Sequence, residues 1–317
     1  MTFIAPPQAA LRIALIGECM IEVQQRSDGQ LNQSFGGDTL NTAVYLRRLL
    51  AAKWQVSYVT ALGDDSFSDA MCAAWASEGL DLSLVQRLPG RLPGLYCIQT
   101  DAQGERRFLY WRNEAAVREC FTQAAAAQVL TALDDYRVFY LSGITLAVLG
   151  EAGLDRVLPR LIAARARGAK LVFDNNYRPR LWRDRQQATE TYQRLLPHLD
   201  LALLTLDDEQ ALFEEADVES IFKRYRQMGV NEVVIKRGAQ SCLVQHQGAL
   251  HEVAATRVAR VIDSTAAGDA FSAAYLACRL QGGIPQQAAA EGHRLAGRVI
   301  QYPGAIIARE AMPGFTQ

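Results

Sequence analysis

The chain has 317 residues, of which 50% are hydrophobic and 21% are charged, and its formal net charge at pH 7 is −1. This length allows one large α/β domain or two ordinary ones, and the composition is typical of a soluble globular protein. A chain so close to neutrality gives no reason to expect nucleic acid or an anionic membrane as a partner.

The N-terminal residues and the cysteines indicate a cytoplasmic protein. The first ten residues lack the basic and apolar regions of a secretory leader, and no apolar run approaches the roughly 18–20 residues of a membrane span. The six cysteines are widely scattered, none forms C-x-x-C, and the four histidines do not cluster near them. Neither a zinc site nor a disulfide framework is therefore indicated, and free thiols in a reducing cytosol are expected.

The first half of the chain is expected to alternate between strands and helices, with one interruption. Residues 91–112 depart from this alternation, because two runs of strand-forming residues flank the polar stretch D-A-Q-G-E with no helix between them. This pattern predicts a hairpin with a tight turn, inserted from a smaller sheet. The other elements expected from apolar periodicity are a strand at 12–17 prolonged by 18–23, a hairpin turn at 27–30, helices at 38–50, 66–79 and 122–133, and strands at 56–62 and 138–141.

The second half continues the alternation. Strands that alternate with helices predict a mainly parallel sheet covered on both faces. No repeat with a period of roughly 20–50 residues and no low-complexity linker divides the chain. One domain over residues 1–317, with a small β lid from about 18–35 and 91–112, fits best. The elements expected here are helices at 150–167, 185–196, 207–213, 218–228, 267–280 and 285–301, strands at 170–174, 201–205 and 232–236, and a local hairpin at 241–244 and 250–253.

A run of small residues lies between two acids in D-S-T-A-A-G-D-A-F-S, residues 263–272. Ala266, Ala267 and Gly268 carry almost no side-chain bulk, so a ligand can approach their backbone N–H groups closely. The helix that follows points its positive end at the same place, which would make an anion hole for a phosphate. Asp269 at the helix start could accept the proton of a hydroxyl that attacks a phosphoryl group. A helix-capping aspartate after a small-residue turn is the alternative interpretation.

A second motif favours the phosphate-transfer interpretation. The stretch F-G-G-D-T-L-N-T-A at 35–43, together with the motif at 263–269, resembles the two signatures of the ribokinase-like sugar kinases, also called the PfkB family. The resemblance implies a three-layer α/β sandwich with a mainly parallel central sheet and a small β-sheet lid. It also implies that the second motif supplies the anion hole and the catalytic aspartate, Asp269. The glycines and the asparagine of the first motif would line the sugar site.

Further blocks resemble one subgroup of that family, the 2-keto-3-deoxygluconate kinases, over nearly the whole chain from about residue 12 to Met312. The resemblance implies ATP-dependent phosphorylation of the C6 hydroxyl of 2-dehydro-3-deoxy-D-gluconate, with Mg²⁺ as cofactor. The blocks are G-E-C-M-I-E at 17–22, R-L-P-G-L-Y at 91–96, Y-W-R-N-E-A-A at 110–116, D-N-N-Y-R-P-R-L-W at 174–182 and K-R-G-A-x-S-C at 236–242.

A sugar acid needs a cation in its site as well as hydrogen-bonding groups. Arg112 and Arg178 are the arginines of the matching blocks, and a guanidinium can bind a carboxylate through two parallel hydrogen bonds. Tyr96 and Tyr110 could bond the keto group or hydroxyls while their rings cover the carbon chain. Arg178 follows the strand at 170–174, at the end where parallel sheets bind ligands. The alternative for Tyr110 and Arg112 is an ordinary half-buried strand, and the alternative for Arg178 is a solvated arginine in a loop.

The first motif supplies four more expected substrate contacts, from Gly36, Gly37, Asp38 and Asn41. Paired glycines suit either a turn or a close approach of substrate to the backbone. Asn41 lies one helical turn further on and offers both a donor and an acceptor. Asp38 could bond a substrate hydroxyl or cap the helix, and both roles stay open.

The nucleotide site is expected at Thr205, Lys236 and Gly238, which resemble the family's ATP-contacting strand ends and loop, together with Ala266 and Gly268 of the anion hole. The alternative for the stretch after Lys236 is a charged turn that follows a buried strand.

Metal binding is expected to be indirect. Many family members carry N-x-x-E near Thr205, and here the register gives L-D-D-E at 206–209, which keeps the acid Glu209 but replaces the asparagine. Magnesium dependence is still expected, because ATP carries the ion and water can complete its shell. Asp263 and Thr265 match positions that bind a monovalent cation in some relatives, which makes K⁺ a further candidate.

The expected partners are the sugar acid and MgATP, and paired lids in the family imply a homo-oligomer through the β lid. The nearest alternative is a sibling kinase for fructose, ribose or another keto-sugar, for which two site arginines would be superfluous. A Rossmann oxidoreductase would need G-x-G-x-x-G after the first strand, where Gly17 is followed by E-C-M-I-E. A non-catalytic sugar sensor of the same fold is disfavoured by the intact Asp269.

Overall fold

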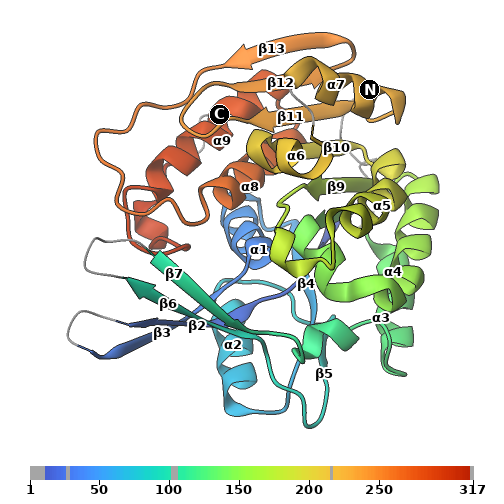
Figure 1. Cartoon of the computed structure of the whole chain (residues 1–317), viewed down its shortest axis with the longest axis vertical. Helices are drawn as coiled ribbons and strands as arrows, with labels where there is room; N and C mark the ends of the chain where they lie inside the picture. Colours follow the sequence, from blue (N-terminus) through green and yellow to red (C-terminus); the bar gives the residue numbers. More distant parts are fainter. Residues whose placement is uncertain (1–10, 26–28, 101–105, 215–216, 315–317) are drawn as a thin grey trace.

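The computed structural model describes residues 11–25, 29–100, 106–214 and 217–314. Its centre is a nine-stranded sheet with the order β13-β12-β11-β10-β9-β8-β1-β4-β5 (Figure 1). The strands are β1 (Leu11–Ile16), β4 (Trp54–Leu62), β5 (Val85–Arg87), β8 (Val138–Ser142), β9 (Lys170–Asp174), β10 (Leu201–Thr205), β11 (Glu232–Lys236), β12 (Cys242–His246) and β13 (Ala249–Val253).

All neighbouring strands from β5 to β11 run parallel, and β12 and β13 add an antiparallel hairpin at one edge. The inner strands are mostly apolar and buried because helices cover both faces of the sheet. Parallel pairing aligns the carboxyl ends of these strands. Ser142 pairs with Asp174, and Thr205 pairs with Lys236. Residues that are far apart in the sequence therefore meet at one edge of the sheet.

Two hydrophobic cores lie on opposite faces of this sheet. Ala14 and Ile16 of β1 belong to one core, and Ile13 and Leu15 belong to the other, as the alternation of side chains along a strand requires. The first core includes residues of α3, α4, α5, α6 and α7, and the second includes residues of α1, α2, α8 and α9. The expected three-layer sandwich is confirmed.

The helices agree closely with the sequence periodicity. They are α1 (Asp38–Leu49), α2 (Ser66–Ser77), α3 (Ala126–Ala132), α4 (Gly143–Ala166), α5 (Arg185–Leu195), α6 (Leu206–Phe213), α7 (Val218–Gln227), α8 (Ala267–Leu280) and α9 (Pro285–Val299). Short 3₁₀ turns lie at Ala116–Glu119, Leu133–Asp135, Pro179–Leu181, Leu196–His198 and Arg309–Ala311.

The smaller sheet, hereafter the lid sheet, has the order β3-β2-β6-β7 (Figure 1). Its strands β2 and β6 pair in parallel, and each also belongs to an antiparallel hairpin. The strands are β2 (Met20–Gln25), β3 (Leu31–Gly36), β6 (Leu95–Thr100) and β7 (Arg106–Trp111). The turn expected at 101–105 lies outside the described residues, as do residues 27 and 28 of the other expected turn.

Four sequence expectations need correction. Residues 18–23 do not prolong the first strand, because β1 ends at Ile16 and the chain enters the lid sheet at Met20. Helix α4 begins at Gly143, since a capping box between Ser142 and Thr145 starts it before the non-helical Gly150, at φ 61°. Helix α3 is shorter than expected at its start, and the short strand β5 was not expected.

Candidate active site

The small-residue motif begins α8 through an uncommon backbone conformation. Ala266 caps the helix with φ 59° and ψ 14°, in the left-handed region, which few non-glycine residues adopt. The N–H of Ala267 is directed back to the carbonyl of Ser264 at 3.3 Å. The N–H groups of Gly268 and Asp269 lie in the first turn, where an α-helix has no acceptor of its own to offer. This helix end can therefore bind an anion through two N–H groups and its dipole.

The two signature motifs meet at Asp269. Nδ2 of Asn41 in α1 donates a 2.9 Å hydrogen bond to Oδ2 of Asp269. The hydroxyl of Thr42 lies 3.5 Å from the backbone carbonyl of Asp269. Helix α1 of the first motif thus packs directly beside the first turn of α8. The carboxylate is fixed by a donor while its other oxygen remains available to a substrate.

The surroundings of Asp269 raise its pKa to about 7. Removal from water is the main cause, and the negative charges of Asp38 and Asp174 add to it. The hydrogen bond from Asn41 and the positive charge of Lys236 act in the opposite direction. A carboxylate with a pKa near neutrality is suited to general base catalysis, because it can both accept and release a proton at the working pH.

A buried network places a lysine beside the anion hole. Nζ of Lys236, at the end of β11, lies 2.7 Å from Oδ2 of Asp174 and 3.3 Å from Oγ of Ser272. A Cβ built on Gly268 would lie 3.6 Å from that Nζ. Asp174 also accepts a 2.8 Å hydrogen bond from Ser272. The ammonium group therefore adds positive charge at the first turn of α8, as expected for a phosphate site.

Three residues of the D-N-N-Y-R-P-R block were not expected to shape the site individually. They are Asp174, Asn175 and Asn176. Nδ2 of Asn176 donates to Oδ2 of Asp38 at 2.7 Å, and the backbone of Asn176 has a positive φ of 24°. Asn175 exchanges two hydrogen bonds with the backbone of Thr205, at 2.8 and 3.0 Å. Their position at the carboxyl end of a parallel strand was the available signal. Asp38 also accepts from the N–H of Thr39 at 2.8 Å, but it is the first residue of α1 and the helix cap is Gly37, so the capping alternative for Asp38 is not supported.

The lid sheet presents a polar and aromatic face. The rings of Tyr96 and Tyr110 have centroids 5.8 Å apart. The Tyr96 hydroxyl donates to Glu22, which also accepts a 2.8 Å hydrogen bond from Ser34. A Cβ on Gly36 would lie 2.4 Å from the Tyr96 hydroxyl oxygen. Gly36 is therefore required by the approach of Tyr96, independently of any substrate.

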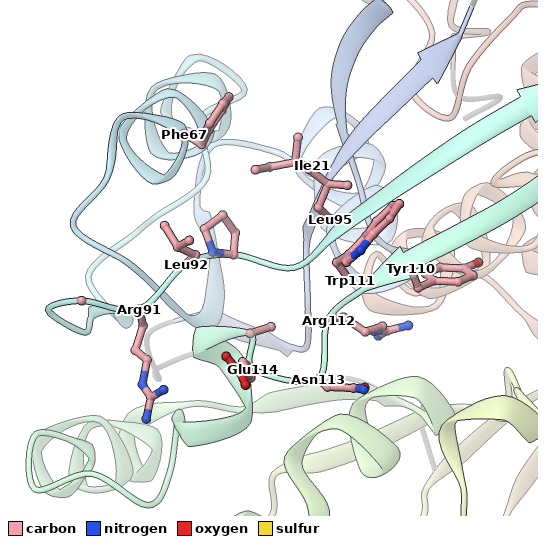
Figure 2. A pocket seen from close by; sticks show the side chains of 13 residues that line it. Ile21, Phe67, Arg91, Leu92, Leu95, Tyr110, Trp111, Arg112, Asn113 and Glu114 are labelled. Carbon is pink, nitrogen blue, oxygen red and sulfur yellow. The ribbon is translucent and has the colours of Figure 1, made fainter.

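Each expected substrate arginine has an acidic partner. The guanidinium of Arg112 pairs with the buried carboxylate of Glu18. Nη1 of Arg178 lies 3.3 Å from Oδ1 of Asp208, and its side chain is 51% exposed. Arg112 has only 8% of its surface exposed, so the two arginines differ in accessibility. Figure 2 shows Arg112 beside Tyr110, at the end of β7 where the chain leaves the lid sheet.

The acid of the L-D-D-E stretch that faces the site is Asp208, and Glu209 points elsewhere. Glu209 has no exposed surface and accepts hydrogen bonds from Arg224, from the Tyr225 hydroxyl at 3.0 Å and from Asn175 at 3.1 Å. The pKa of Asp208 is raised by burial first and also by Asp174. Glu209 thus bridges α6 and α7 and also contacts Asn175, whose side chain bonds the backbone of Thr205, so the expected indirect role in metal binding stays a prediction.

The remaining expected positions lie in loops near the site. Oδ1 of Asp263 accepts from the N–H and hydroxyl of Thr265 at 3.0 and 2.6 Å, and Oδ2 accepts from the N–H of Gly304 at 3.0 Å. These bonds fold the loop before α8. Gly238 adopts φ 60° in the turn after β11. No cluster of three or more His, Cys, Asp or Glu suited to a metal occurs within the described ranges.

A pocket of about 550 Å³ lies at the base of the lid sheet (Figure 2). It contains Tyr110 and Arg112, but its lining includes neither Asp269 nor Lys236. Most of its wall is apolar, and it includes the exposed side chains of Phe67, Leu92 and Trp111. The pocket therefore lies apart from the phosphate-transfer residues. In the part of the chain that the structure describes, no helix combines the length and apolar character needed to cross a membrane.

Comparison with known proteins identifies the family. The model of the pfkB family carbohydrate kinases matches residues 10–312. The 2-dehydro-3-deoxygluconokinase of Dickeya dadantii is 53% identical over 305 residues, which cover 95% of this chain and 98% of that protein. The enzyme of the same name from Escherichia coli K12 is 51% identical over 306 residues, with 95% and 99% coverage.

A solved structure shows the same fold. A fructokinase from Xylella fastidiosa with bound ATP superposes with a TM-score of 0.80 at 24% identity, over 96% of each chain. The order of the two motifs, their meeting at Asp269 and the lid sheet agree with the match over nearly the whole chain. This chain belongs to the pfkB family of carbohydrate kinases.

Proposed function

We propose that this kinase transfers the γ-phosphoryl group of ATP to the C6 hydroxyl of 2-dehydro-3-deoxy-D-gluconate. The products are 2-dehydro-3-deoxy-6-phospho-D-gluconate and ADP. The observation that carries the proposal is the pairing of an anion hole and base at Asp269 with two arginines, Arg112 and Arg178, at the sugar side. Relatives more than half identical over 95% of the chain bear the name of this activity.

Asp269 acts as the general base in this proposal. Its ionised carboxylate accepts the C6 hydroxyl proton as the oxygen attacks the γ-phosphorus, and the bond from phosphorus to the β,γ-bridging oxygen breaks. The electron pair of that bond leaves with ADP. The N–H groups of Gly268 and Asp269 and the ammonium of Lys236 stabilise the charge on the transferring phosphoryl group. Ala266 and Ala267 shape this turn.

The sugar acid lies between the lid sheet and α1 in this proposal. Arg112 and Arg178 bind its carboxylate, and Tyr96 and Tyr110 cover its carbon chain. Around them, Asn41 and Asp38 face its hydroxyls, and Gly36 and Gly37 allow the close approach of Tyr96 and of the Glu18 backbone that shapes this side of the site. Closing the lid sheet over the substrate excludes water, which would otherwise compete as the nucleophile and hydrolyse ATP.

The nucleotide binds along the carboxyl ends of β10 and β11, near Thr205, Lys236 and Gly238. Magnesium bound to ATP would neutralise phosphate charge. The residues present fit an ion held mainly by phosphates and water. Asp208 of α6, near Asp174 and Lys236, is the acid that would lie beside it. The two oxygens of Asp263 already accept hydrogen bonds from Thr265 and from the distant Gly304, so K⁺ is not part of the proposed site.

The proposal extends to location and assembly. All six cysteines are free thiols, which is usual in a reducing cytoplasm. Two copies pair through their lid sheets, in line with the exposed Trp111, Leu92 and Phe67 around the pocket. Trp111→Glu would then shift the particle mass from oligomer to monomer, as measured by light scattering.

The product identifies the reaction. Incubation with ATP, Mg²⁺ and the keto acid should yield a new phosphorus signal coupled to the protons on C6, as measured by ³¹P nuclear magnetic resonance. Phosphate at another carbon would overturn the assignment of the attacking hydroxyl. Release of inorganic phosphate without a sugar phosphate would show that the site does not exclude water.

A further inference from the structure

The chain crosses between the main sheet and the lid sheet at four places, and all four meet around one residue, Glu18. Residues 17–19 link β1 to β2, and Gly37 links β3 to α1. Gly94 precedes β6, and Arg112 follows β7. Glu18 has 2% of its surface exposed, although it is a charged residue. A buried carboxylate at this junction requires a physical reason.

At two of the crossings the chain passes so close to Glu18 that only glycine fits. A Cβ on Gly37 would lie 2.2 Å from the carbonyl oxygen of Glu18. A Cβ on Gly94 would lie 2.8 Å from Oε1 of Glu18 and 3.2 Å from Cβ of Arg112. Side chains at these positions would collide with the backbone and carboxylate of Glu18. The base of the lid sheet is therefore packed around this acid.

The carboxylate of Glu18 holds one edge of the Arg112 guanidinium. The terminal nitrogen Nη2 of Arg112 donates to Oε2 of Glu18, and both side chains are buried. Burial raises the pKa of Glu18, while the charge of Arg112 opposes that rise. Among the described residues, Nε of Arg112 and Oε1 of Glu18 are buried with no hydrogen-bond partner. The guanidinium therefore keeps an unpaired N–H donor beside its ion pair with Glu18.

The guanidinium of Arg112 lies beside the aromatic residues of the lid sheet that the proposed function assigns to the substrate. Its Cζ lies 5.9 Å from the centroid of the Tyr110 ring, and that ring neighbours Tyr96. Figure 2 shows its side chain extending beside Tyr110. The crossings hold Glu18 in place, and Glu18 in turn holds the guanidinium of Arg112.

We propose that Glu18 is a positioning residue for the sugar acid: it holds one edge of Arg112 and thereby aims the remaining guanidinium donors at the substrate carboxylate. The inference rests on the proposed function, because it assumes an acidic substrate. Glu18 also balances the charge of Arg112 when the site is empty. Selection of the acid then depends on guanidinium geometry rather than on an uncompensated positive charge.

Glu18→Gln keeps the shape of the side chain and removes its charge. The amide oxygen of glutamine can still accept from Arg112, but the bond is no longer between two charged groups, so kcat/KM for the keto acid should fall about tenfold or more. The KM for ATP should stay unchanged. Glu18→Asp serves as the second variant, because it keeps the charge but draws the carboxylate back by one methylene. Thermal unfolding of each variant shows that the fold is retained.

A double-mutant cycle separates positioning from a merely structural role. In an Arg112→Met background, Glu18→Gln should have no further effect on kcat/KM for the keto acid, since it acts only through that guanidinium. In an Arg178→Ala background, the same change should cost its full factor. An equal cost in both backgrounds, or an equal rise in the KM for ATP, would overturn the inference. Failure of the proposed function is distinguishable, because the wild-type enzyme would then prefer a neutral sugar.

Discussion

The side-chain amide of Asn41 donates a 2.9 Å hydrogen bond to the carboxylate of Asp269, although 228 residues separate them in the chain. Asn41 belongs to the glycine-rich motif near the N-terminus, and Asp269 belongs to the small-residue motif near the C-terminus. A residue expected to contact the sugar thus also sets the position and proton affinity of the base. The two motifs form one unit in space, which links substrate binding to the chemical step.

Asp269→Asn is expected to nearly abolish turnover. The amide has the size of the carboxylate but cannot accept the hydroxyl proton, and a general base contributes roughly 10²–10⁴-fold to a rate. ATP binding, measured by calorimetry, should be largely retained. Asp207→Asn, at an exposed acid of α6, is the matched control and should be fully active. Normal turnover by the Asp269 variant would remove the residue from its role.

The pH profile should follow the ionisation of Asp269. Its pKa is about 7, and only the ionised form accepts a proton, so kcat/KM is lost as the pH falls through that value. Below it, log kcat/KM should decline by about one for each pH unit. Asn41→Leu removes a bond that lowers this pKa. The acidic limb of that variant should therefore move up by about one pH unit. An unmoved limb would show that another group is titrating.

The order and type of most elements could be predicted from periodicity, because helices and strands here keep their apolar spacing. The start of α4 could not, since Gly150 interrupts the pattern while Ser142 caps the helix earlier. Residues 20–23 belong to the lid sheet because β2 pairs with β6, and no local sequence pattern indicates this pairing.

The site was predictable where a motif carries it, and not where a side chain has a long-range partner. Asp269, Asn41 and Lys236 were named from sequence, and the structure brings them together. Arg112 and Glu18 are 94 residues apart in the chain, and nothing in the sequence near either residue indicates that they form a buried pair. Glu209 and Asp208 are adjacent in the chain, so only the helix orientation shows which of them faces the site.

Arg178→Ala is expected to weaken binding of the keto acid. This side chain is 51% exposed, so its removal should leave the fold intact. Loss of a guanidinium bound to a carboxylate should raise the KM for the acid by about tenfold to 100-fold. Arg180→Ala, at a neighbouring exposed arginine, serves as the control. Initial rates at varied acid and fixed ATP measure the change, and an unaltered KM would contradict the assigned role.

The neighbouring acids of α6 should separate cleanly on substitution. Glu209→Gln removes the buried charge that pairs with Arg224, whose side chain is 13% exposed, and breaking a buried pair costs about 3–5 kcal/mol of unfolding free energy. Asp208→Asn should instead raise the magnesium concentration needed for half-maximal rate, with little change in stability. Urea unfolding and magnesium titrations distinguish the two effects. The reverse result would return Glu209 to the nucleotide site.

Glu232 should make stability depend on pH at a distance from the site. Burial raises the pKa of Glu232, but hydrogen bonds with His246, Arg279 and the Tyr275 hydroxyl outweigh burial and lower the pKa overall. Arg279 donates at 2.7 and 2.8 Å and Tyr275 at 2.6 Å. The stabilisation is therefore present above the ordinary carboxyl range and is lost as the pH falls through the depressed pKa. The difference in unfolding free energy between wild type and Glu232→Gln should shrink on acidification. A constant difference would argue against this linkage.

The most direct test of the central claim is a comparison of substrates by ADP release with ATP and Mg²⁺. The substrates are 2-dehydro-3-deoxy-D-gluconate, its galactonate epimer, fructose and ribose. The account predicts that kcat/KM for the keto acid exceeds that for either neutral sugar by about 100-fold or more, because neutral sugars leave the arginines without a carboxylate. Preference for fructose or ribose would keep Asp269 and the anion hole but contradict the roles of Arg112 and Arg178.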